Sequence, residues 1–211
     1  MLGLSPDTLL AFTLTSLLLA VAPGPDNLGV LSLGLSRGRR AASGFAFGCA
    51  AGCLVHTLLA AVGVSALIAA SPTAFTALKL IGAAYLLYLA WQAFRSSGGV
   101  RLAAAGGDAE RRFWPYVGRG LIANAINPKV ALFFLAFLPQ FITHDTQAGA
   151  QIVLLGSIFM LSAMLVFQLL ALFSGALGAW LQRRARVGVW LDRLTGTLFV
   201  GLAARLALAQ R

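Results

Sequence analysis

The segment AVAPGPDNLGVL, residues 20–31, lies inside the first long apolar stretch of the chain and decides how the fold is interpreted. Pro23 and Pro25 lack the N–H group that a helix interior needs, and a residue that precedes a proline avoids the helical conformation. Asp26 follows directly, although a charged side chain in hydrocarbon is costly without a partner. The segment therefore predicts a membrane helix broken at a point where protein or a cavity, rather than lipid, surrounds the backbone.

The composition around this segment is that of a membrane protein. Of the 211 residues 59% are hydrophobic and 10% are charged, and the mean hydropathy is +0.86, which excludes an ordinary soluble domain. The apolar residues form blocks of about 20 residues or more, the length at which a helix crosses a bilayer. We therefore predict an all-α integral membrane protein in contact with lipid. Its six transmembrane helices are expected at residues 8–35, 42–70, 73–94, 121–141, 148–177 and 190–208.

The basic residues indicate the orientation of these spans. Twelve of the sixteen lie in the first, third and fifth connections: Arg37, Arg39, Arg40, Arg95, Arg101, Arg111, Arg112, Arg119, Arg183, Arg184, Arg186 and Arg193. The connections around Ser71 and at residues 142–149 have none. Because basic loops stay in the cytoplasm, both termini are expected outside. The first apolar stretch has no basic leader and is expected to be a retained span rather than a signal peptide. The net charge of +10 thus belongs to loops, and no nucleic-acid partner is expected.

The chain divides into two halves around a polar connection. Residues 96–119 are rich in Gly, Ala and charge, and they separate a first half, 1–95, from a second half, 120–211. Three spans per half give the halves opposite orientations, which predicts two inverted three-helix repeats. Pro25 and Pro128 break the first helix of each repeat. At about 1.5 Å per residue, both breaks lie about 20 Å from the outer face, so they can meet in one site.

These breaks are the predicted substrate site. Each one starts a new half-helix whose free N–H groups favour an anion such as a carboxylate. The candidate substrate-binding residues are Pro23, Gly24, Pro25, Asp26, Asn27, Asn124, Asn127, Pro128 and Lys129. Asp26 would accept the substrate ammonium or a proton, and Lys129 would pair with Asp26 or with the substrate carboxylate. The competing interpretation is a plain kink capped by Asp26 or Asn27, with Lys129 extended toward the cytoplasmic face.

Three stretches of the sequence resemble a known family. They are APGPDNLGVLSLGLSRGRRAASGFAFG, ALKLIGAAYLLYLAWQAFR and NPKVALFFLAFLPQF. Together they resemble the lysine exporter and homoserine/threonine efflux family of bacterial inner-membrane proteins, over residues 9–208. The resemblance implies proton-driven efflux of amino acids or related small molecules, and it places residues 23–27 and 127–129 on the two family motifs. It does not specify the substrate.

The second span offers an alternative function. Cys49, Cys53 and His56 share one helical face, and such soft ligands could hold a thiophilic metal in a heavy-metal exporter. The alternative is that the cysteines pack and that His56 bonds a neighbouring helix. His56 could also relay a proton to Asp26, because histidine titrates near neutral pH. No cofactor is expected.

Further polar and small residues complete the predictions. The spans contain no catalytic pair, so the chain is not expected to be an enzyme. Gly44, Gly48 and Gly52 form a ridge for close helix packing, either within one chain or in a homodimer. Tyr85, Tyr88 and Gln168 could line the cavity or bond between helices. Apart from Asp26 no acidic residue is expected deep in a span, which favours a neutral amino acid as substrate.

Overall fold

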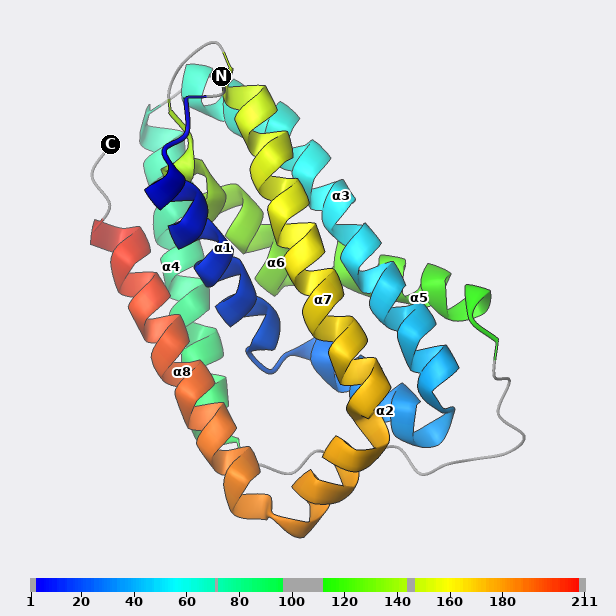
Figure 1. The fold of residues 1–211 in the computed structure, drawn as a ribbon. Coiled ribbons are helices and arrows are strands. Elements are labelled where there is room, and N and C mark those ends of the chain that lie inside the picture. Colours follow the sequence, from blue (N-terminus) through cyan, green and yellow to red (C-terminus); the bar gives the residue numbers. More distant parts are fainter. Residues whose placement is uncertain (1–2, 71, 97–111, 144–146, 209–211) are drawn as a thin grey trace.

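The computed structural model describes residues 3–70, 72–96, 112–143 and 147–208, and these residues form helices without a strand among them (Figure 1). The elements are α1 (Pro6–Val21), α2 (Pro25–Ser36), α3 (Arg39–Ala70), α4 (Pro72–Arg95), α5 (Trp114–Ala125), α6 (Pro128–Leu132), the π-helix η1 (Phe133–Phe137), the 3₁₀ helix η2 (Leu138–Phe141), α7 (Ala148–Arg183) and α8 (Ala185–Leu208). The expectation of an all-α chain is confirmed for this part of the sequence.

Both predicted breaks are present as sharp bends. Four helices (α3, α4, α7 and α8) are long and apolar enough to cross a membrane, and two bent pairs can each supply one more span. The first pair, α1 with α2, is bent by 51°, and the second, α5 with the segment Pro128–Phe141, by 50°. The chain is therefore a multi-pass membrane protein with four to six spans.

One predicted boundary is wrong by two helical turns. The fourth span was expected from residue 121, but α5 begins at Trp114 and takes up the last part of the predicted connection 96–119. Pro115 explains the early start, because proline is favoured in the first turn of a helix, where its missing N–H has no partner to lose. Most of the connection, with Arg101 and Arg111, lies outside the described residues, and so does Ser71.

The helices pack in two groups. The helix α3 packs along α5 and α7, and α2 and α1 also pack on α7. The second group is the pair α4 and α8, which share an extensive contact with each other, while α8 touches α7 little. In Figure 1 this pair stands apart from α7, α3 and α2, and the ends of α1 and α8 nearest the termini lie at the same end of the bundle.

The glycine ridge is used inside the chain. A Cβ atom at Gly44 or Gly48 would collide with the backbone carbonyl of Phe113 or Val117, where α5 lies against α3. At Gly52 a Cβ would come within 2.7 Å of the Asn124 side chain. The ridge thus lets α5 approach α3 closely, and it gives no support to the homodimer that the sequence left open.

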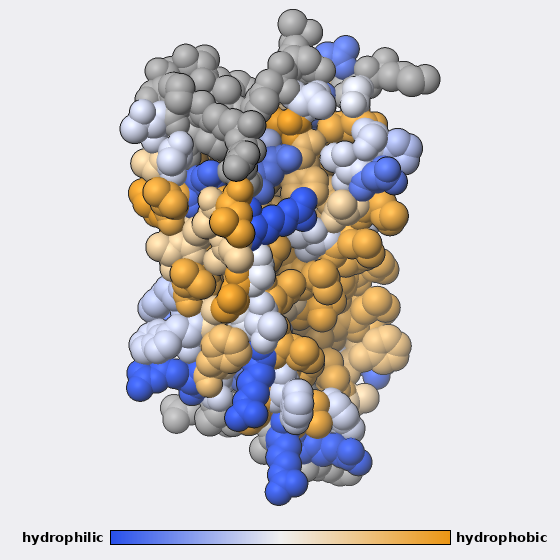
Figure 2. Space-filling view, turned by 90° about the vertical axis from the view of Figure 1, so that its left-hand side faces the viewer, coloured by the Kyte–Doolittle hydropathy of each residue, from blue (hydrophilic) through white to orange (hydrophobic). Residues whose placement is uncertain are grey.

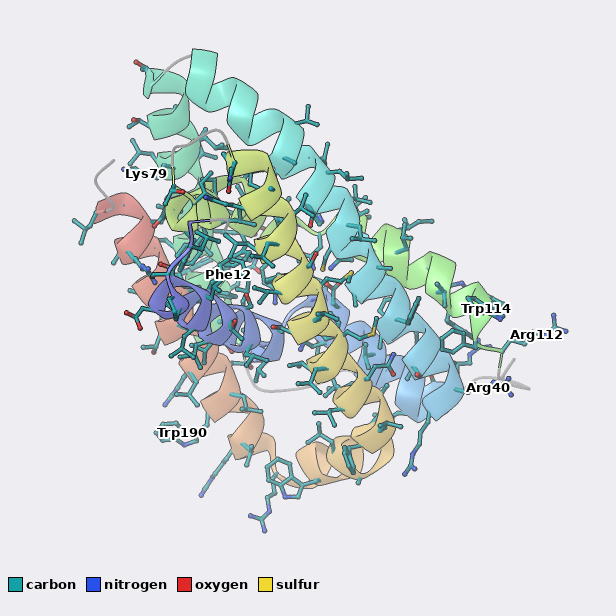
Figure 3. All side chains as sticks on the ribbon, turned by 45° about the horizontal axis from the view of Figure 1, so that its top comes forward. Phe12, Arg40, Lys79, Arg112, Trp114 and Trp190 are labelled. Carbon is teal, nitrogen blue, oxygen red and sulfur yellow. The ribbon has the colours of Figure 1, made fainter. Side chains whose placement is uncertain are left out.

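The outer surface is suited to lipid. On the face made by α1, α4 and α8, hydrophobic side chains form a broad band and hydrophilic ones gather toward the ends (Figure 2). Large apolar side chains are also exposed on other helices, for example Leu58 at 65% and Val62 at 75% on α3. Arg40, Arg112 and Trp190 extend from the periphery of the bundle (Figure 3).

Six phenylalanines fill the end of the bundle nearest the termini. This aromatic cluster consists of Phe12, Phe133, Phe134, Phe137, Phe141 and Phe159. Phe12 reaches into the interior from α1 (Figure 3), and its ring centroid lies 5.1 Å from that of Phe141. The guanidinium of Arg205 on α8 lies 4.9 Å from the Phe141 centroid, which adds a cation–π contact. The cluster therefore joins α1, η1, η2, α7 and α8 at this end.

Candidate functional site

The first break separates α1 from α2. The helix α1 ends at Val21, and Gly24 precedes α2 in an extended conformation (φ −172°, ψ −179°), with Pro25 in the first turn. Any residue can adopt this conformation, so the need for glycine is spatial. A Cβ at Gly24 would lie 2.8 Å from the Nζ atom of Lys129. Gly24 thus leaves room for the lysine of the second break.

At the second break, a side chain caps the helix that follows. Asn127 is the N-cap of α6, and its Oδ1 accepts a hydrogen bond from the Lys129 N–H at 3.0 Å. Pro128 occupies the first helical position, which suits its fixed φ angle. The backbone N–H of Asn127 donates to the carbonyl of Asn124 at 2.8 Å, which closes the turn after α5.

The two breaks are joined by hydrogen bonds in both directions. Oδ2 of Asp26 accepts from the amide Nδ2 of Asn124 at 2.8 Å and from that of Asn127 at 3.0 Å. In return, the Lys129 ammonium donates to the carbonyls of Ala22 at 3.1 Å and Leu19 at 3.4 Å. These carbonyls are among those that the end of α1 leaves without helical donors. Each break therefore supplies the partners that the other lacks.

The charged side chains of the breaks are buried. Asp26 is 2% exposed and Lys129 is 6% exposed, so the lysine does not extend to a membrane face. Within the described residues the two make no direct ion pair, because both are bonded to neutral groups. Asn27 is also buried, and its amide donates to the Ala20 carbonyl at 2.8 Å. The second carboxylate oxygen of Asp26, Oδ1, has no hydrogen-bond partner among the described residues.

A cavity of about 900 Å³ opens beside the breaks, between them and the helices α4, α7 and α8. Six predicted site residues line it: Pro23, Gly24, Pro25, Asn27, Asn127 and Lys129. Asp26, Asn124 and Pro128 do not, so the predicted acceptor of the substrate ammonium lies behind the cavity wall. The cavity extends as far as Ser96 and Gly188, at the end of the bundle opposite the aromatic cluster.

The wall formed by α4 and α8 includes a carboxylate that the sequence analysis missed. Asp192 lines the cavity, together with Thr195 on α8 and Tyr85, Tyr88 and Gln92 on α4. Asp192 was overlooked because it lies at the edge of the expected span, next to Arg193. The available signal was spacing: Asp192, Thr195 and Phe199 are three and seven residues apart and so share one helical face. A second carboxylate, besides that of Asp26, therefore lies close to the predicted site.

Other polar candidates have structural partners. Nε2 of His56 lies 2.9 Å from the Asn124 carbonyl, so Asn124 links His56 to Asp26, and no hydrogen bond between His56 and Asp26 is found among the described residues. Gln168 does not line the cavity, because it bonds Ser43.

The heavy-metal alternative is not supported by the arrangement of the second span. The Cys53 thiol donates to the Cys49 carbonyl at 3.7 Å, and His56 is engaged with α5. Among the described residues no three His, Cys, Asp or Glu side chains come together as a metal site.

Comparison with known proteins decides the family. The family model described as LysE type translocator matches residues 17–210. This chain belongs to the LysE type translocator family. The predicted resemblance is confirmed over nearly the whole chain, including both breaks.

Related proteins of this family are membrane and efflux proteins. A homoserine/homoserine lactone efflux protein of Salmonella typhi is 31% identical over 95% of this chain and 96% of its own length. A leucine efflux protein of Enterobacter sp. is 34% identical over 90% of each chain. An uncharacterized membrane protein of Vibrio cholerae is 33% identical over 95% of this translocator and 97% of the relative. No solved structure matches the chain. The activities named are transport activities, and none indicates an enzyme.

Proposed function

We propose that this LysE type translocator exports amino acids or closely related small molecules across the bacterial inner membrane in exchange for protons. The observation that carries the proposal is the meeting of two broken helices at one cavity. In transporters with broken helices, such a meeting point serves as the substrate site, because free backbone groups and half-helix termini can bind charged groups there. The efflux activities named for relatives of nearly equal length agree with this role.

The proposed orientation places both termini outside the cell. Arg37 and Arg40 lie where α2 meets α3, and Arg184 lies where α7 meets α8. The cavity reaches toward this arginine-bearing end, which the positive-inside rule assigns to the cytoplasm. In this orientation the cavity faces the cytoplasm, and the aromatic cluster closes the route to the outside.

Alternating access would require the aromatic cluster to open while the cytoplasmic end closes. Two features support a movement of one repeat against the other. The second helix of the first half, α3, packs on its counterpart α7, and the third helix, α4, packs on its counterpart α8. The breaks are also bent by nearly the same angle, 51° and 50°. These pairings are those expected of inverted repeats.

In this scheme Asp26 carries the proton. Its Oδ2 holds Asn124 and Asn127 of the second break, and its Oδ1 is available for protonation. Protonation removes the negative charge that strengthens both hydrogen bonds, and so weakens the joint between the breaks. Cargo binding would occur on the cavity side, where Lys129 and the amides of Asn27 and Asn127 can receive a carboxylate.

Everted membrane vesicles test the function and the coupling together. In such vesicles the cytoplasmic face is outside, so the translocator should accumulate labelled leucine or homoserine when the lumen is acid. A protonophore should abolish accumulation. Asp26→Asn should lose accumulation but retain exchange of labelled for unlabelled substrate, whereas Asp7→Asn, the same change at the exposed start of α1, should behave as the wild type.

Two results would contradict the proposal. An absence of amino-acid transport by the wild type in vesicles that contain the protein would refute the function. Accumulation by Asp26→Asn at the wild-type rate and with unchanged pH dependence would refute the coupling role of Asp26.

A further inference from the structure

The cavity has walls of opposite character. On the side of the breaks, Lys129 brings an ammonium group and Asn27 and Asn127 bring amides. On the other side α4 and α8 bring the carboxylate of Asp192 and the rings of Tyr85 and Tyr88. Among the described residues that line the cavity, Lys129 is the only basic side chain and Asp192 the only acidic one. A zwitterion placed between these walls would meet a positive group on one side and a negative group on the other.

Asp192 is well placed to receive a cation. Its side chain is partly exposed, and no hydrogen bond or ion pair of the carboxylate is found within the described part of the chain. The cavity wall beside it is largely apolar, with Leu191 and Phe199 on the same helix. Carboxylates within membrane spans usually pair with a cation or lie on a substrate pathway. Lys129 cannot serve as this cation without leaving the carbonyls of Leu19 and Ala22.

The tyrosines of α4, which line the same wall as Asp192, add a second feature typical of ammonium sites. The ring centroids of Tyr85 and Tyr88 lie 5.9 Å apart, and Trp91 extends the row with its centroid 6.0 Å from that of Tyr88. At the end of this row the Arg95 guanidinium lies 4.9 Å from the Trp91 centroid. Trp91, at the end of the row, therefore already binds one cation on its aromatic face. An ammonium group in the cavity would be attracted by the same interaction.

We propose that Asp192, together with Tyr85 and Tyr88, binds the ammonium group of the cargo, while the Lys129 side of the cavity binds its carboxyl end. This inference rests on the proposed export function and makes it more specific. The cargo class is then amino compounds with a free primary amine. Asp26 is left for the proton, since it lies behind the wall and cannot reach the cargo without a rearrangement of the breaks.

The test uses purified protein in liposomes and measures exchange of labelled leucine or homoserine, which needs no proton gradient. Competitors are the unlabelled amino acid and its N-acetyl derivative, which lacks the ammonium. For the wild type, the N-acetyl derivative should compete about tenfold more weakly or worse, since one charge-assisted hydrogen bond is lost. Asp192→Asn should raise the KM of the free amino acid by about tenfold or more, yet change inhibition by the N-acetyl derivative by less than about twofold.

Matched variants separate recognition from damage to the fold. Asp192→Glu keeps the charge and should retain discrimination against the N-acetyl derivative, and Asp7→Asn should match the wild type throughout. If the wild type is inhibited equally by both competitors, the inference is wrong, and this result does not depend on the folding of any variant. If Asp192→Asn has the same KM for the free amino acid as the wild type, the role of Asp192 in binding the ammonium is also refuted. The proposed export function is not affected by that result. If the wild type exchanges no amino acid, the proposed function fails and the inference fails with it.

Discussion

The two breaks bend the chain by almost the same angle but are built differently. The first is formed by Pro23, Gly24 and Pro25 without a side-chain cap, and it contributes an acid, Asp26. The second is capped by Asn127 and contributes a base, Lys129. The base bonds the carbonyls at the end of α1, and the acid bonds the amides at the second break. Neither break is complete by itself, because the first lacks donors and the second lacks an acceptor.

The largest effect is expected from Lys129→Met. The change leaves the Leu19 and Ala22 carbonyls without this donor and leaves Asp26 as an uncompensated buried charge. A hydrogen bond to a charged group contributes about 1.5–3 kcal/mol, so loss of the two bonds of Lys129 should lower the unfolding free energy by about 3–5 kcal/mol, and export should be lost. Thermal unfolding in detergent and vesicle transport measure the two effects. An unfolding free energy of Lys129→Met close to that of the wild type would contradict this role of Lys129.

An exchange of partners tests whether the breaks bond as described. Asn124→Asp alone should be strongly destabilising, because its carboxylate would face that of Asp26. Combined with Asp26→Asn, it restores an amide opposite a carboxylate. The double variant should therefore recover about 1–3 kcal/mol relative to the sum of the single variants. If the losses of unfolding free energy of the two single variants simply add in the double variant, the contact between Asp26 and Asn124 is contradicted. Denaturant unfolding of the three variants measures these losses. Proton-driven export should stay low in the double variant, because the carboxylate then belongs to α5.

The support behind the second break can be weakened from the neighbouring helix. Gly48→Ala puts a methyl group against the Val117 carbonyl and should push α5, and with it Asn124, away from α3. Overpacking of this kind costs about 1–3 kcal/mol. Gly63 lies on the same helix with open space around its Cβ position, so Gly63→Ala should be neutral or stabilise by up to about 1 kcal/mol. Similar unfolding temperatures for both variants would show that the ridge does not hold α5.

The smallest effect should distinguish the asparagines of the two breaks. Asn27→Ala removes one hydrogen bond, to the Ala20 carbonyl, and should cost about 1 kcal/mol. Asn127→Ala removes both the cap on the Lys129 N–H and a bond to Asp26, so it should cost about 2 kcal/mol. Equal losses of unfolding free energy would mean that the second break is no more dependent on its asparagine than the first.

The sequence was sufficient to predict the position of the breaks, because a missing N–H at Pro25 or Pro128 disrupts a helix in any surroundings. It also predicted that the two breaks meet, and hydrogen bonds join them in the structure. The partners of the charges could not be predicted, because a bond between Lys129 and the Ala22 carbonyl depends on how helices more than a hundred residues apart pack together. Asp192 was missed for a related reason. A carboxylate at the end of an expected span, beside an arginine, has the pattern of a loop, and only the packing of α4 and α8 places it on the cavity.

The reciprocal bonding of the breaks has a consequence for biosynthesis. Asp26 is made 98 residues before Asn124 and 101 residues before Asn127. During translation the early segment must therefore remain without its lasting partners while the following helices are inserted. The early segment can reach its final conformation only after the second half has been inserted. We therefore expect the chain to be most sensitive to quality-control proteases while only its amino-terminal half has been made.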